Sequence, residues 1–157
     1  MRVISFDLTD ESIDAAIEEL KAYRDHVDAA TLRAVKRLAE DGAENAKELA
    51  SFMNAVDTGE LVGSIKGEAD GNEGVIRADC GHAAYVEFGT GVVGARNPHP
   101  VGWAYDVNGH GDAGWMYPGD DGHYHWTKGM PARPYMYDTA QMMAQAVPDV
   151  VAEELQL

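Results

Sequence analysis

The chain has one cysteine, few basic residues and no long apolar run. Cys80 has no second cysteine to pair with, which excludes an intrachain disulfide. Twelve Lys and Arg against 27 Asp and Glu leave no basic stripe, so sequence-specific nucleic-acid binding is not expected. No apolar segment has the length of a membrane-spanning helix, and the first residues lack the apolar core of a secretion signal. We therefore expect a chain made and assembled in the cytoplasm, without a membrane partner.

The excess of carboxylates is informative in itself. The formal net charge is −15, and repulsion among the acidic side chains destabilises a compact chain in dilute buffer. Salt screens this repulsion. The composition therefore favours a source with a high salt concentration, and the alternative is an ordinary acidic cytosolic protein.

At 157 residues the chain is expected to form a single domain, residues 1–157, of the α+β class. Residues 1–56 are predicted to hold an arm and N-terminal helices, including one long amphipathic helix. Residues 57–130 are predicted to form a small, mainly antiparallel sheet with long aromatic loops, because glycine is frequent there and the helical period is lost. Residues 131–157 are predicted to hold a C-terminal helix.

Two apolar patterns predict the N-terminal helices. Thr9 or Asp10 is suited to cap the first, and the second is expected from about residue 28 to about residue 54. The apolar residues at helical spacing are Ile13, Ala16, Ile17 and Leu20 in the first pattern, and Leu32, Val35, Ala39, Ala43, Ala46, Leu49, Ala50 and Met53 in the second. In the C-terminal helix, Pro148 is expected to cause a kink or an interruption.

Glu87 is the clearest candidate for an acid or a base. A buried carboxylate beside Phe88 would have a raised pKa, but the neighbouring sequence supplies no catalytic partner. A structural role is favoured, in which Glu87 caps backbone amides or forms an ion pair. The following Gly89-Thr90-Gly91 lacks the lysine of a P-loop and the third glycine of a dinucleotide site. These glycines are expected to supply positive φ or close backbone approach.

Histidine and acidic residues in the aromatic stretch raise a metal hypothesis. Zinc could be held by His123 and His125 together with His99, His110 or another ligand. Calcium could be held by Asp106, Asn108 and Asp112, or by Asp120 and Asp121. Because no thiol cluster, His-Glu-x-x-His or EF-hand spacing is present, we expect no metal and no cofactor. Cys80 has only His82 nearby, and no catalytic residue is expected.

Three motifs occur in a defined order along residues 28–155. They are Asp57-Thr58-Gly59-Glu60-Leu61-Val62-Gly63-Ser64-Ile65, then Tyr85-Val86-Glu87-Phe88-Gly89-Thr90-Gly91, then Pro131-Ala132-Arg133-Pro134-Tyr135-Met136. In these motifs the chain resembles the tail-completion (head–tail joining, tail-component) family of long-tailed phages and related archaeal viruses. Two departures are Tyr135, where the family usually has Phe, and the long aromatic stretch 92–126.

The resemblance implies a non-enzymatic virion protein. It would form a homo-oligomeric ring, expected to be hexameric, in the neck between capsid and tail. Its partners would be head-closure, tail-terminator and tail-tube proteins, and assembly would occur in the host cytoplasm. Head-closure or tail-terminator subunits are alternatives within the virion. A metal-dependent enzyme using the His-rich loop, or a host-interaction module, is the alternative from another class.

Under this interpretation the motif residues have structural or interface roles. Asp57 and Thr58 would bond backbone amides, so that the long helix ends and a strand starts at Gly59. The segment from Glu87 to Gly91 would form a rigid corner from which the aromatic loops project. The expected set is Asp57, Thr58, Gly59, Leu61, Ser64, Ile65, Tyr85, Glu87, Phe88, Gly89, Thr90, Gly91, Trp103, Trp115, Pro131, Pro134, Tyr135 and Met136.

Overall fold

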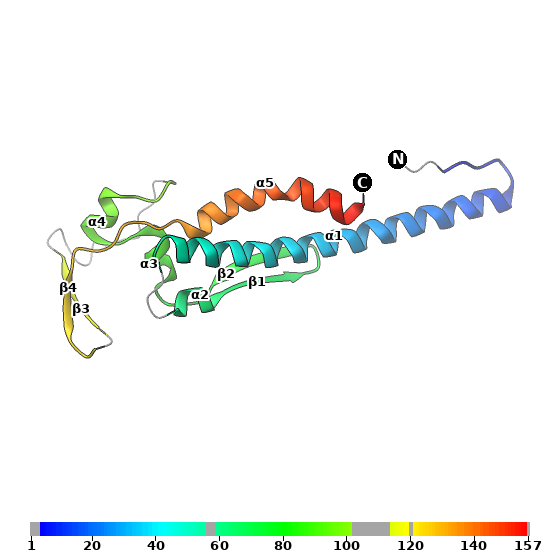
Figure 1. Cartoon of the computed structure of the whole chain (residues 1–157). Coiled ribbons are helices and arrows are strands. Elements are labelled where there is room, and N and C mark those ends of the chain that lie inside the picture. The colour runs from blue at the N-terminus through cyan, green and yellow to red at the C-terminus, as the bar shows by residue number, and fades with distance from the viewer. Residues whose placement is uncertain (1–3, 56–58, 102–113, 120, 157) are drawn as a thin grey trace.

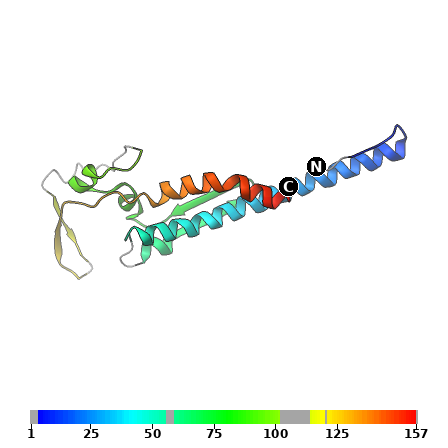
Figure 2. The ribbon, with the colours of Figure 1, turned by 45° about the horizontal axis from the view of Figure 1, so that its top comes forward.

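The computed structural model describes residues 4–55, 59–101, 114–119 and 121–156, and confirms an α+β fold (Figure 1). The elements are α1 (Asp10–Phe52), α2 (Glu60–Ser64), β1 (Ile65–Asp70), β2 (Glu73–Ala78), α3 (Ala83–Phe88), α4 (Gly91–Arg96), β3 (Trp115–Pro118), β4 (Tyr124–Thr127) and α5 (Tyr135–Leu155). The molecule is elongated. The β3–β4 hairpin lies at one end and the start of α1 at the other, in both views (Figures 1 and 2).

The two helical patterns expected near the N-terminus form one continuous helix, α1, of 43 residues. Thr9 is its N-cap, and the Thr9 hydroxyl accepts from the Ser12 amide at 3.4 Å. Nothing between the two patterns breaks the helix, because residues 21–31 contain neither proline nor glycine. The described part of the arm, residues 4–9, is not in a strand.

The second half of α1 packs against both α5 and the β1–β2 hairpin. Small residues form its buried face, namely Ala30, Ala34, Ala39, Gly42, Ala43, Ala46 and Ala50. A side chain at Gly42 would overlap Ile76 of β2 and contact Met143 of α5, and one at Gly67 of β1 would overlap the Ala39 carbonyl. The alanine-rich face expected from the sequence therefore lets a hairpin and a helix approach the same length of α1.

The strands form two separate antiparallel hairpins in the described residues, rather than one sheet. In the first, β1 pairs with β2 from Ile65↔Ala78 to Asp70↔Glu73. In the second, β3 pairs with β4 from Trp115↔Thr127 to Pro118↔Tyr124. The expectation that a strand starts at Gly59 is wrong. Gly59 has φ +83° and is the N-cap of α2, and the strand starts at Ile65.

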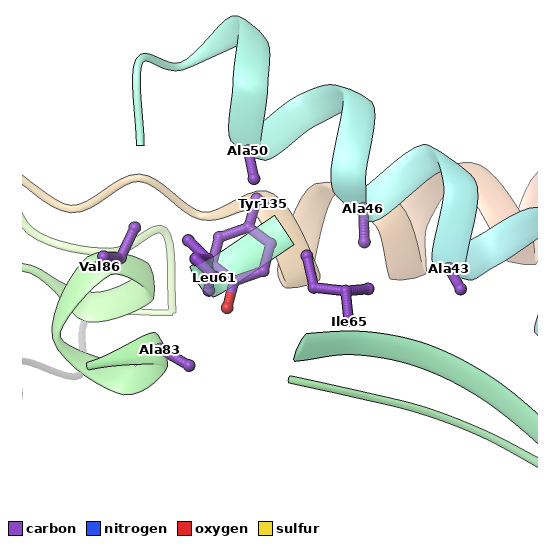
Figure 3. Close-up of a cluster of buried hydrophobic side chains, with 8 residues drawn as sticks. All are labelled: Ala43, Ala46, Ala50, Leu61, Ile65, Ala83, Val86 and Tyr135. Carbon is purple, nitrogen blue, oxygen red and sulfur yellow. The ribbon is translucent and has the colours of Figure 1, made fainter. Parts of the chain in front are cut away.

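The core lies where α1, α2, α3 and α5 meet (Figure 3). Leu61, Ile65 and Tyr135 are its largest buried apolar side chains, packed with Val86 and the alanines of α1. The helical turn of α2 is favoured over a strand because it buries Leu61 while the Ser64 hydroxyl donates to the Leu61 carbonyl at 2.8 Å. Helix α5 continues through Pro148 without ending there.

Candidate functional site

Glu87, at the end of α3, caps the N-terminus of α5. Its Oε2 accepts from the Met136 amide and its Oε1 from the Tyr137 amide, each at 2.9 Å. The carboxylate is buried, with 6% of the residue exposed. The first amides of a helix have no partner within the helix, and their partial positive charge favours a carboxylate. The expected capping role of Glu87 is thus confirmed, although the helix it caps begins 48 residues later in the chain.

His99 completes the hydrogen bonding of Glu87. The Val101 amide donates to His99 Nδ1 at 3.3 Å, so Nδ1 accepts and the ring proton of a neutral imidazole lies on Nε2. Nε2 then donates to Glu87 Oε1 at 3.0 Å. The ring also packs against Phe88 and Tyr137, with centroids 4.6 and 5.2 Å apart. His99 is therefore a buried structural residue that joins the segment after α4 to α3 and α5.

Gly89 and Gly91 form the corner expected from the sequence. Both have positive φ, +73° and +63°. Between them, Thr90 exchanges backbone hydrogen bonds with Met130 at 2.9 and 3.1 Å. A side chain at Gly89 would lie 2.6 Å from the Ala132 nitrogen, and one at Gly91 would overlap the Lys128 carbonyl. The corner is thus closed by the chain that leads from β4 into α5.

The β3–β4 hairpin leaves this corner with one apolar face uncovered. The register places Met116 opposite Trp126 and Pro118 opposite Tyr124, on the same side of the two strands. Met116, Trp126 and Tyr124 are 50%, 57% and 71% exposed. We call Met116, Pro118, Tyr124 and Trp126 the aromatic face.

The other side of the hairpin is only partly covered, and Tyr117 on that side is 44% exposed. Trp115 lies against Gly91, and the rings of Tyr117 and His125 are 5.7 Å apart. In the turn, Asp121 accepts from the His123 amide at 2.9 Å and contacts His125 Nε2 at 3.0 Å. The hydrogen bond with His125, and then that from the His123 amide, hold the pKa of Asp121 below its usual value.

The structure brings together part of the expected residue set. Leu61, Ile65, Glu87, Thr90 and Tyr135 are buried in the subunit, so their roles are internal. Burial, and then the nearby charge of Glu87, raise the pKa of Tyr135. Pro131 and Pro134 lie in the segment leading into α5, and Pro134 is its N-cap. Asp57, Thr58 and Trp103 lie outside the described residues.

Sequence reasoning missed the aromatic face as a unit. Of this hairpin, the expected interface set contained only Trp115, which lies on the opposite side from Met116 and Trp126. The alternation of side chains along 115–118 and 124–127 was a usable signal, because neighbouring strand residues point to opposite faces. Sequence reasoning also missed the helix α4, and considered His99 only as a metal ligand.

Within the described ranges, no group of three or more His, Cys, Asp and Glu side chains is placed to hold a metal ion. The His125 side chain contacts Asp121, whereas His123 bonds Asp121 only through its backbone amide. Asp106, Asn108, His110, Asp112 and Asp120, also considered as ligands, lie outside the described residues. The strand that would have aligned Cys80 with His82 ends at Ala78.

Comparison with protein families gives a match in the segment from α1 to the corner. Residues 14–89 match the HK97-gp10-like family, described as bacteriophage HK97-gp10, putative tail-component. The resemblance expected from the motifs is confirmed. The matched tail-component segment is just under half of the chain and ends at Gly89, so it contains Glu87 but not the β3–β4 hairpin or α5.

The matched segment is thus similar to a putative component of a phage tail. No significant match was found among curated proteins or among solved structures. Of the helices in the described residues, none is both long and apolar enough to span a membrane.

Proposed function

We propose that this protein is a tail-completion subunit in the neck of a long-tailed virus (a siphovirus). Identical copies would form a ring, with six as the expected number, between the capsid and the tail. The tail-component match supports the general role. The motifs that extend the resemblance to the entry of α5, and the exposed aromatic face, support the neck position.

The aromatic face is the observation that supports this function best. Trp, Tyr and Met are enriched in protein interfaces, and Trp and Tyr are prominent among the residues that dominate the binding energy. A two-stranded hairpin is marginally stable alone in water, so covering this face would also stabilise the hairpin. The Gly89–Gly91 corner and the Glu87 cap fix where the hairpin leaves the body. We infer that the aromatic face docks on a neighbouring neck or tail protein.

The acidic composition supports a virus of a halophilic host. A net charge of −15 on 157 residues is tolerated best where salt screens it.

Head-closure or tail-terminator subunits occupy the same region of a particle, and the position of the chain in separated particles distinguishes them from a tail-completion subunit.

Mass spectrometry of purified particles, and of separated capsids and tails, tests this function. We expect the chain in the tail fraction, at a few copies per particle. Absence from particles would contradict a virion role, and presence only on tail-less capsids would favour head closure.

A pair of variants tests the docking face. Trp126→Ser should reduce incorporation of the chain into tails, because it removes an exposed aromatic anchor. Val75→Ser is the matched control, because Val75 is 54% exposed on the other hairpin. Circular dichroism of both purified variants checks that they fold. Equal incorporation of the two would contradict the role of the aromatic face.

A further inference from the structure

Residues 4–9, which we call the arm, have the sequence pattern of a β-strand but lie in no strand. Apolar Ile4, Phe6 and Leu8 alternate with polar residues, and this period of two is typical of a strand with one covered face. Phe6 and Leu8 are nevertheless 60% and 90% exposed. The arm thus has an apolar face that the described part of the chain leaves largely uncovered.

The backbone of the arm is bonded only where it meets α1. The Asp7 amide donates to the Ser12 hydroxyl at 3.0 Å, and the Thr9 amide donates to the Asp7 carboxylate at 3.0 Å. The amides and carbonyls of Ile4 and Phe6 have no hydrogen-bond partner among the described residues. These two alternate residues can therefore bond a neighbouring strand while the attachment to α1 is kept.

The β1–β2 hairpin has an open edge on its β1 side. The Asp79 amide donates to the Ser64 carbonyl at 3.4 Å, so the even-numbered residues of β1 bond β2, and Gly67 and Ala69 direct their amides and carbonyls outward. No described residue bonds these outward groups. Such an edge is a template for a further strand, and a two-stranded sheet is stabilised by a third.

A groove of about 370 Å³ lies beside this edge, between β1 and α1. Lys66 lines it from β1 and has no ion pair with any described residue. The acidic side chains of the groove are all paired, and the pairs are Glu40 with Lys36, Asp41 with Arg37, Glu44 with Lys47, and Glu68 with Arg77. The unpaired charge at the β1 edge is therefore positive, in a chain that is acidic as a whole.

The arm fits the β1 edge in one antiparallel register. When Phe6 is opposite Gly67, Ile4 is opposite Ala69, and the unbonded backbone groups of the arm meet those of β1. A side chain at Gly67 would overlap the Ala39 carbonyl, so this face of β1 is turned toward α1. Phe6 would lie on the same face, across the glycine and over the groove, as aromatic residues do beside glycines at sheet edges.

The charges agree with this register. It places Asp7 opposite Lys66 at a position without ladder hydrogen bonds, where the side chains of the two strands lie closest. Asp7 is the one charged residue of the arm, and Lys66 is the unpaired cation of the edge. The Asp7 amide is not needed for the ladder there, so its bond to Ser12 can persist.

The arm cannot reach the β1 edge of its own subunit. Gly67 approaches α1 at Ala39, and α1 rises about 44 Å from Asp10 to Ala39 at 1.5 Å per residue. Phe6 is four residues before Asp10, so it lies within about 14 Å of the start of α1 even in an extended chain. The start of α1 and the β1–β2 hairpin are well separated along the helix (Figures 1 and 2). Any strand that receives the arm therefore belongs to another molecule.

We propose that the arm of one copy adds to the β1 edge of a second copy as a third, antiparallel strand, with Phe6 opposite Gly67. Each chain carries both parts of the match, namely a strand pattern without a sheet and a sheet edge without a strand. The pairing rests on the proposed function only in requiring more than one copy. Because each copy donates at one surface and accepts at another, the contact is heterologous and can close a ring.

Cysteine cross-linking between two full-length chains tests the pairing. Both chains carry Cys80→Ala; the donor also carries Ser5→Cys and the acceptor Glu68→Cys. The register places these two thiols directly opposite each other, within the range of a disulfide. In an equimolar mixture in molar KCl with a mild oxidant, we expect the mixed disulfide dimer, with its linked peptides identified by mass spectrometry.

Val75→Cys is the matched control for the acceptor. Val75 is opposite Glu68 on β2 and is 54% exposed, but β1 would separate it from the arm by two strand spacings, about 10 Å. We expect several-fold more mixed dimer with Glu68→Cys than with Val75→Cys, and circular dichroism checks that each variant folds. Equal yields, or no dimer with Glu68→Cys, would overturn the proposal. Linkage of the Ser5→Cys arm to a different tail protein in particles, and not to Glu68→Cys, would overturn it as well.

A charge exchange tests the register. Lys66→Glu in the acceptor should lower the yield of mixed dimer several-fold, because Asp7 would then face a carboxylate, and Asp7→Lys in the donor should restore it. Lys21→Glu in the acceptor is the control, because Lys21 is exposed on α1 and pairs with Glu18 away from the groove. Failure of the double exchange to restore the yield, or an equal loss with Lys21→Glu, would refute this register.

The pairing and the proposed function fail separately. If the wild-type chain is found in tails while the Ser5→Cys and Glu68→Cys chains do not cross-link, the pairing is wrong and the proposed function stands. If these chains cross-link while the wild-type chain is absent from particles, the pairing stands and the proposed function is wrong.

Discussion

The carboxylate of Glu87 lies 3.0 Å from His99 Nε2 in the interior of the subunit. The same carboxylate accepts from the Met136 and Tyr137 amides. One side chain thus joins α3, the segment after α4 and the start of α5. The aromatic face lies just beyond this junction, so its position depends on how well these three segments are held together.

Replacing Glu87 should destabilise the subunit more than its single charge suggests. Glu87→Ala leaves two amides and His99 Nε2 buried without an acceptor, and we expect a loss of about 3 kcal/mol in the free energy of unfolding. Glu87→Gln keeps one acceptor oxygen and should cost less. Urea unfolding in molar KCl measures both.

The control for Glu87 is Glu44→Ala. Glu44 is exposed and pairs with Lys47 on the surface of α1, so its removal should change the free energy of unfolding by less than about 1 kcal/mol. Similar losses for Glu87→Ala and Glu44→Ala would show that the cap contributes nothing beyond a surface ion pair.

Replacing Gly89 should distort the corner. In Gly89→Ala the new side chain must adopt φ near +73° and would lie 2.6 Å from the Ala132 nitrogen. The backbone conformation alone costs about 1–2 kcal/mol, and the overlap adds to it. We expect a lower unfolding midpoint and lower yields of assembled oligomer, and Gly89→Val should be worse.

Gly81→Ala is the matched control for the corner. Gly81 is also in the turn region before α3, but its φ is not positive and a side chain there would meet open space. Normal assembly of Gly89→Val, or equal losses in Gly81→Ala and Gly89→Ala, would contradict the importance of the corner.

The sequence was sufficient for features with a local period and insufficient for contacts across the chain. The spacing of Ala39, Ala43, Ala46 and Ala50 predicted the buried face of α1, because every third or fourth residue returns to the same side of a helix. Leu61 and Ile65 were placed in the motif set with structural or interface roles, but the helices that bury them could not be named. The capping role of Glu87 could be stated, but its target could not, because Met136 and Tyr137 are far away in sequence.

The errors have identifiable physical causes. At Gly59, a short apolar segment after a turn is compatible with a strand or a helical turn, and packing of Leu61 on α1 decides for the helix. Two short hairpins were expected as one sheet because strand pairing is a non-local choice. His99 has no local pattern that distinguishes a metal ligand from a buried partner of Glu87.

Alkaline pH should destabilise the fold through Tyr135. Burial and the charge of Glu87 raise the pKa of this phenol, so the folded chain retains a proton that the unfolded chain loses above about pH 10. Below that pH, ionisation of Tyr135 does not lower the free energy of unfolding. Above it, the free energy of unfolding falls by about 1.4 kcal/mol per pH unit until the pH reaches the pKa of Tyr135 in the folded chain. Tyr135→Phe should flatten the dependence of unfolding free energy on pH above 10.

Tyr124→Phe is the control for Tyr135, because Tyr124 is largely exposed on the aromatic face. Its substitution should leave the slope above pH 10 unchanged. The same slope for wild type and Tyr135→Phe would show that Tyr135 titrates in the folded chain as it does in the unfolded chain.

Salt should stabilise the folded chain. With a formal net charge of −15, carboxylates repel one another more strongly in the compact state than in the unfolded one. Raising the ionic strength from 0.01 M to 1 M shortens the Debye length from about 30 Å to about 3 Å. We therefore expect a higher urea midpoint in molar KCl than in dilute buffer, with urea chosen because it adds no ionic strength.

Sucrose matched in osmolality is the control, because it stabilises by exclusion without screening. Equal midpoints in dilute buffer and molar KCl would contradict the halophilic origin, since the repulsion that salt relieves would then be absent.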